Sequence, residues 1–162
     1  MVHLNSFQST PYFGGDVSSV VVDEHMNTFG GNGKVNFGLV DVVDVGLGVY
    51  GGVMDVVEGA DSVLIVIRQL MQHLSTAECL KVIENVVSLK KDNAEKRILV
   101  GLTTYLRGNG NDDDSYLLAT GHKINLFARP FCLGDPLIMG VDGAFDMYFG
   151  VWEVEAEGMV LC

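Results

Sequence analysis

The chain has 162 residues, of which 48% are apolar, so it can fold as a single domain around a hydrophobic core, and disorder is excluded. Its formal net charge of −11 leaves few cations to displace the counterions of a polyanion, so we expect no nucleic-acid partner. No apolar run reaches the ~20 residues of a membrane span, and the first ten residues lack a signal-peptide pattern, so neither a membrane partner nor signal-directed secretion is expected.

The first third of the chain reads mainly as β-structure. Residues 1–16 are interpreted as an N-terminal arm, and Val17 to Asp23 as a short strand. The segment from Val35 to Val45 begins with the alternation of a half-buried strand, which then blurs. Gly46 to Gly59 contains five glycines and predicts one kinked strand or two short ones.

A central helical element is predicted at about 62–92. Its second half is well defined, because Ser75 and Glu78 have the spacing of a capping box and Asn93 can end the helix. Two lysines, at 90 and 91, stand in the last turn, where the helix dipole favours cations. The polar stripe between these ends is narrow, so we expect most of this helix to be buried against a sheet or another layer.

The first half, Ser62 to Leu74, allows two interpretations. Apolar residues at 63, 67, 70, 71 and 74 have helical spacing, which favours a helical hairpin broken near Ser75. Val63 to Ile67 is also an unbroken apolar run, as in a buried strand. The alternative is therefore a strand–helix–strand unit with a parallel crossover that ends in the β-rich segment Arg97 to Leu106.

The last third returns to β-structure. Tyr116 to Thr120 and Lys123 to Phe127 are predicted strands. Asp142-Gly143 separates Leu137–Val141 from Ala144–Val151, which is a hairpin signal. The apolar positions of the last strand change parity between Val151 and Trp152, which predicts a β-bulge or sharp twist at residues 150–152.

These elements predict an α+β fold with a mainly antiparallel sheet of seven to nine strands, glycine-rich turns and the central helical element. An α/β, Rossmann-like fold is the alternative.

The order of segments from Leu39 to Leu106 resembles that of the Ras-like small GTPases. The chain shows LVDVVDV, with Asp44 near its end, then ADSVLIVI, a helix, and RILVGL. Leu47 replaces the family's glycine, and residues 102–105 (LTTY) replace its guanine-reading Asn-Lys-x-Asp. The resemblance implies a degenerate nucleotide-binding domain, unable to hydrolyse GTP, with Gly33, Lys34 and Asp44 near the ligand. Apart from this resemblance, the glycines before Lys34 indicate a β-turn. A phosphate loop needs another glycine and a Ser or Thr, which this segment lacks.

Other candidate site residues carry weaker signals. Asp112, Asp113 and Asp114 could ligate a hard cation but lack EF-hand spacing, and a solvated turn is the simpler interpretation. His25, beside two carboxylates and a glycine-rich loop, is the one histidine that could serve in an acid/base cleft. The three cysteines, at 79, 132 and 162, lack metal-ligand spacing, which favours a reducing compartment.

No catalytic constellation or cofactor motif is complete, so we expect no cofactor and favour a non-enzymatic protein. The leading hypothesis is a structural or interaction protein whose partner is itself or another protein. A virion or phage assembly subunit and a phage-encoded inhibitor fit this profile, with a cytoplasmic or virion-associated location. The alternatives are the degenerate nucleotide-binding domain and an enzyme with a loop-built acid/base site.

Overall fold

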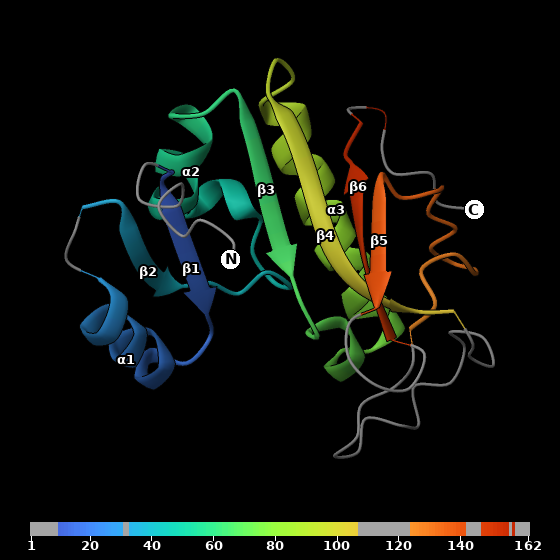
Figure 1. The fold of residues 1–162 in the computed structure, drawn as a ribbon, viewed down its shortest axis with the longest axis horizontal. Helices are drawn as coiled ribbons and strands as arrows, with labels where there is room; N and C mark the ends of the chain where they lie inside the picture. Colours follow the sequence, from blue (N-terminus) through green and yellow to red (C-terminus); the bar gives the residue numbers. More distant parts are fainter. Residues whose placement is uncertain (1–9, 31–32, 107–123, 142–146, 156, 158–162) are drawn as a thin grey trace, which may run out of the picture.

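The strands in the described part of the chain form two sheets (Figure 1). The structure, a computed structural model, describes residues 10–30, 33–106, 124–141, 147–155 and 157. Within these residues, a two-stranded sheet has the order β1-β2 and a four-stranded sheet has the order β3-β4-β6-β5. The smaller sheet stands beside β3 without a hydrogen-bonded ladder to it.

The centre of the molecule is a strand–helix–strand unit. β3 (Ser62–Ile67) and β4 (Arg97–Tyr105) are parallel, and α3 (Thr76–Asp92) forms the crossover between them. The helical interpretation of Ser62 to Leu74 is therefore wrong, and the strand alternative is confirmed for its first part. After β3 the chain makes only a short 3₁₀ turn, η3 (Met71–His73). The β-branched residues of β3 favour a strand, and their backbone groups form hydrogen bonds with β4. This preference outweighs the helical spacing of the apolar residues that follow.

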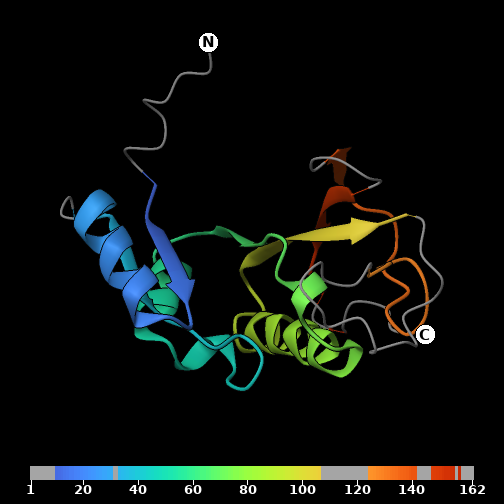
Figure 2. The same cartoon turned by 90° about the horizontal axis from the view of Figure 1, so that it is seen from below.

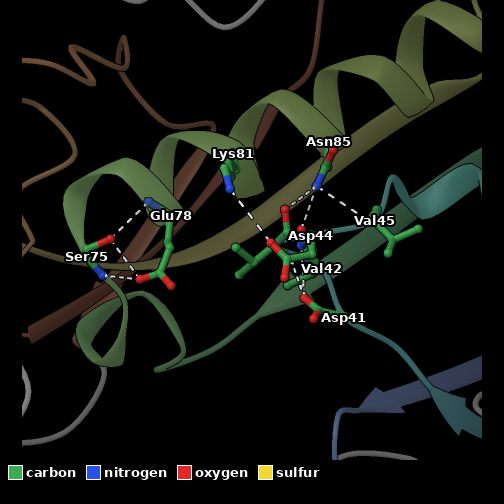
Figure 3. Close-up of polar contacts among 9 residues, drawn as sticks. Asp41, Val42, Asp44, Val45, Ser75, Glu78, Lys81 and Asn85 are labelled. Carbon is green, nitrogen blue, oxygen red and sulfur yellow. Dashed lines mark hydrogen bonds and ion pairs between the residues drawn. The ribbon is translucent and has the colours of Figure 1, made fainter.

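Helix α3 confirms the boundaries that its caps predict. Ser75 accepts a hydrogen bond from the backbone N–H of Glu78, and the Glu78 carboxylate accepts from the backbone N–H of Ser75 (Figure 3). Asn93 is the C-cap. The apolar side of α3 is buried at Cys79, Val82, Ile83, Val86, Val87 and Leu89. Figure 2 shows α3 against one face of the larger sheet, and the hydrophobic core lies between the helix and the sheet.

Strand β6 (Met147–Glu153) lies between β4 and β5 (Ile138–Val141) and is antiparallel to both. Its register with β4 runs without a break from Leu99↔Glu153 to Tyr105↔Met147. The predicted β-bulge at residues 150–152 is therefore wrong. Gly150, Val151 and Trp152 are all buried, because both faces of this internal strand are covered at that point, so the change of parity needs no extra residue.

The first part of the chain differs most from its prediction. Within the supposed arm, Tyr12–Asp16 forms β1, which pairs in parallel with β2 (Val35–Leu39). Residues 1–9 lie outside the described residues. The segment predicted as a strand at Val17 to Asp23 is instead the start of α1 (Ser19–Phe29), so that prediction is wrong. A parallel pair cannot be joined by a tight turn, and the crossover imposes a helix on β-branched residues.

The glycine-rich segment 46–59 is also helical, not β. It forms a 3₁₀ turn, η2 (Leu47–Val49), and α2 (Gly51–Glu58). A Cβ at residue 52 would lie 2.2 Å from the Phe13 ring, so Gly52 lets α2 pack closely on β1. Tertiary packing therefore overrides the low helix propensity of glycine.

The α+β class is confirmed, but the sheet details are not. The described residues contain six strands in two sheets, not seven to nine, and two of the four strand pairings are parallel. Residues 124–127 of the predicted strand Lys123 to Phe127 are not a strand, while Tyr116 to Thr120 and the Asp142-Gly143 turn lie outside the described residues. No helix in the described ranges has the length and apolar character needed to cross a membrane.

Candidate functional site

Among the strands that the structure describes, β5 is the outermost strand of the larger sheet, next to β6 alone. All four of its residues are exposed, including Ile138 at 67% and Val141 at 75%, and the preceding Leu137 is 55% exposed. The segment Leu137–Val141 contains no charged residue. Alternate residues of an edge strand direct their N–H and C=O groups away from the sheet, where they can pair with another strand. Natural edges are usually protected by short length, charge, proline or a bulge, and of these β5 has only its length of four residues.

Asp44, predicted near a nucleotide, lies in the loop that follows β2 (Figure 3). This loop has its own hydrogen bonds, because Asp41 Oδ1 accepts from the N–H groups of Val43 and Asp44, both at 3.0 Å. The Asp44 carboxylate is 71% exposed and lies 3.7 Å from Lys81 Nζ on α3. Asn85, one helical turn further along, donates through Nδ2 to the carbonyl oxygens of Val42 at 2.7 Å and Val43 at 3.2 Å.

Gly33 and Lys34 lie at the opposite end of β2 from Asp44. Gly33 has φ +71°, a left-handed conformation that suits the predicted β-turn, and nothing lies within 4 Å of the position its Cβ would occupy. The carbonyl of Lys34 accepts from Tyr12 N at 2.8 Å, which begins the β1–β2 ladder. The five residues of β2 separate Lys34 from the Asp44 loop by about 16 Å, at about 3.3 Å per residue. The structure does not bring these three residues together, and their role with a nucleotide stays a prediction.

His25 lines a cleft between α1 and the β1–β2 sheet, together with Asp16. The His25 ring lies 5.3 Å from the Phe37 ring, centroid to centroid. The Asp16 carboxylate accepts from Ser18 N at 2.8 Å. Asp23 and Glu24, the carboxylates beside His25 in the sequence, are not among the described residues that line the cleft. The acid/base role of His25 stays a prediction. Asp112 to Asp114, the candidate metal ligands, lie outside the described residues, as does Cys162.

The two described cysteines are not exposed nucleophiles. Cys79 is fully buried, and its thiol lies 3.3 Å from the carbonyl oxygen of Met71. Cys132 is half-buried and disulfide-bonded. The reducing compartment stays a prediction.

The acidic row Glu153, Glu155 and Glu157 is exposed, as its alternation with Trp152 and Val154 predicts. The Arg97 guanidinium donates to both carboxylate oxygens of Glu153, at 3.1 and 2.9 Å. These hydrogen bonds hold the pKa of Glu153 below its ordinary value of 4.5 and raise that of Arg97. The pair joins β4 to β6 on the surface and is structural in character.

Sequence reasoning identified Leu137–Val141 as a strand but missed its role as a free edge. Its five uncharged residues are a usable signal, yet strand order decides whether such a segment is internal or external. Comparison with known proteins found no matching family model, and no curated protein matched the chain. The functional conclusion therefore depends on the fold and on the geometry of these residues.

Proposed function

We propose that the protein is a non-enzymatic structural or interaction protein that self-associates through the outer edge of β5. The observation that supports the proposal is the exposed, uncharged and apolar strand Ile138–Val141, preceded by exposed Leu137. Two such edges can pair antiparallel about a two-fold axis, because the same surface then serves both copies. The resulting sheet would continue through both molecules and remove two open edges.

The charge of the protein favours an uncharged surface for contact between two copies. With a net charge of −11, two copies repel each other over most of their surfaces. The β5 segment itself holds no charge, so the repulsion is weakest where the apolar side chains meet. An uncharged, apolar segment on an acidic protein is therefore better suited to contact a second copy of the chain than the rest of the surface is. A virion-associated location stays a prediction within this class.

The proposal is tested by light scattering behind size exclusion over a wide concentration range. We expect a species of at least twice 17.5 kDa at high concentration. Val141→Lys places a charge at a residue that is 75% exposed, and we expect it to weaken association at least tenfold. The matched control is Val49→Lys, because Val49 in η2 is also exposed, at 68%, and is not part of β5. A monomer at every concentration, or equal effects of the two substitutions, would overturn the proposal.

The degenerate nucleotide-binding domain is a second candidate, favoured by the parallel β3–α3–β4 unit. In sheets of this kind ligands bind at the carboxyl ends of the strands. A nucleotide present at 100 times its Kd would stabilise the fold by about 2.7 kcal/mol, which raises the Tm of a protein of this size by roughly 5–10 °C. Thermal melts with GTP or ATP and magnesium test this candidate, and an unchanged Tm at millimolar nucleotide would remove it.

A further inference from the structure

The cleft between α1 and the β1–β2 sheet has the size and lining of a small-ligand site. Its volume is about 350 Å³, within the range of roughly 300–1,000 Å³ that ligand pockets occupy. Three aromatic side chains line it, from Tyr12 on β1, Phe37 on β2 and Phe29 on α1. Val22 and His25 complete the α1 side, since residues 22, 25 and 29 share one face of the helix.

The aromatic wall of the cleft is held in place by close packing. A Cβ at residue 14 would lie 2.5 Å from Phe37 Cδ1, so the Phe37 ring packs directly against the Gly14 backbone. Tyr12 meets the same ring edge-to-face, with centroids 5.8 Å apart. The His25 ring approaches Phe37 from the helix side. The sheet side of the cleft is therefore preorganised by glycine and ring contacts, which lowers the entropic cost of binding.

The cleft stays open because α1 does not sink into the sheet. None of the eleven residues of α1, all of them described, is buried. Phe29 remains 59% exposed and Tyr12 54% exposed, although both line the cleft. These rings therefore present apolar surface to a ligand and are not sealed into a core.

The charge of the cleft is negative. Asp16 lies at the carboxyl end of β1 and lines the cleft, and its carboxylate is held by a hydrogen bond from Ser18 N. No Lys or Arg is among the described residues that line the cleft. The net charge of −11 adds a field that attracts cations and repels anions. Aromatic faces also attract cations through the ring quadrupole.

We propose that this cleft binds a small organic cation with an aromatic or apolar body, its charged group at Asp16 and its body against Tyr12, Phe29 and Phe37. His25 would contribute one wall and a ring nitrogen for a polar substituent. This site is independent of the β5 edge and is expected in the monomer as well as in any assembly.

The test compares ligands that share one ring system and differ in charge. The probes are 1-naphthylmethylammonium and 1-naphthoate, with 1-naphthalenemethanol as the neutral member, titrated by calorimetry into the full chain. We expect the ammonium to bind at least tenfold more tightly than the carboxylate, with the alcohol between them. Equal affinity of the three probes, or tighter binding of the carboxylate, would overturn the proposal.

Two substitutions locate the bound probe. Asp16→Asn keeps the size of the side chain and an oxygen for the Ser18 N–H, and should lower affinity for the ammonium at least fivefold while leaving the alcohol unchanged. Asp55→Asn is the matched control, because Asp55 is an exposed carboxylate on α2 that does not line the cleft. Val22→Trp fills the cleft with an indole ring and should abolish binding of all the probes. Circular dichroism verifies the fold of each variant, and unaltered ammonium binding in both Asp16→Asn and Val22→Trp would place the probe elsewhere.

Discussion

At the scale of single residues, Asn85 connects a helix to a distant loop. Its side-chain amide ties helix α3 to the backbone of the loop after β2, through the carbonyls of Val42 and Val43. We expect Asn85→Ala to lower the free energy of unfolding by about 1–2 kcal/mol, because the hydrogen bonds from its half-buried amide to the carbonyls of Val42, Val43 and Val45 are lost. Urea denaturation measures the change. Ser88→Ala, on the exposed side of the same helix, is the control and should stay within about 0.5 kcal/mol of the wild type.

Gln69 is the second residue with a local consequence, because it adopts φ 59° two residues after the end of β3. Its backbone N–H donates to Thr103 Oγ1 at 3.0 Å, which fixes this left-handed conformation. Gln69→Val should lower stability by about 1–2 kcal/mol, since a β-branched residue is strained at positive φ, whereas Gln69→Gly should be neutral or mildly stabilising. Thermal melts of both variants measure these changes in stability. A glycine variant no more stable than the valine variant would contradict the strain.

At the scale of elements, the Arg97–Glu153 pair connects β4 to β6 and makes stability depend on pH. The pKa of Glu153 is lower in the folded chain than its ordinary 4.5, so the pair contributes fully above that value. Its contribution is lost as the pH falls through the lowered folded pKa and the carboxylate gains a proton. A double-mutant cycle with Arg97→Met and Glu153→Gln should therefore show a favourable coupling at pH 7 that decreases as the pH is lowered toward 2. High salt should weaken the coupling at pH 7, because both side chains are substantially exposed. A coupling that persists undiminished at pH 2 would contradict an ionic contribution.

The elements that sequence could predict are those whose signals are local. The ends of α3 follow from Ser75, Glu78 and Asn93, because a capping box satisfies backbone groups within one turn. The sequence left β3 undecided between strand and helix and wrongly predicted a strand at the start of α1. Both segments contain β-branched runs, whose secondary structure depends on the tertiary neighbours they pack against. α2 was obscured by Gly51 and Gly52, and the space that the Phe13 ring needs is visible only in three dimensions.

The candidate sites likewise combine features that the sequence predicts with features that depend on the three-dimensional fold. A hairpin of Leu137–Val141 with the following strand was predictable from its apolar flanks, and the antiparallel β5–β6 pairing confirms that the two strands are neighbours. That β5 is the outer strand follows from the chain order β3-β4-β6-β5, a long-range property. His25 could be singled out by its carboxylate neighbours, but its aromatic surroundings come from two strands and a helix brought together by folding.

At the scale of the whole molecule, stability is distributed unevenly along the chain. Among the described residues, every side chain of the buried core lies between Leu47 and Val154, and none comes from β1, α1 or β2. Local opening requires less free energy where few apolar side chains are buried. The N-terminal unit β1–α1–β2 should therefore open without unfolding of the larger sheet.

Native-state hydrogen exchange tests this division. The internal amides of β4, such as those of Val100 and Leu102, should exchange only with global unfolding, because both residues are 1% exposed. The amides of α1 should exchange through local opening at less than about half of that free energy, with little dependence on denaturant at low concentration, since little surface is exposed. The naphthylmethylammonium probe should raise the protection of α1 and leave β4 unchanged, because it binds the folded β1–α1–β2 unit and not its locally opened form. Equal free energies of exchange for α1 and β4 would instead show that the two sheets unfold as one cooperative unit, and that packing through α2 couples them more strongly than their buried side chains indicate.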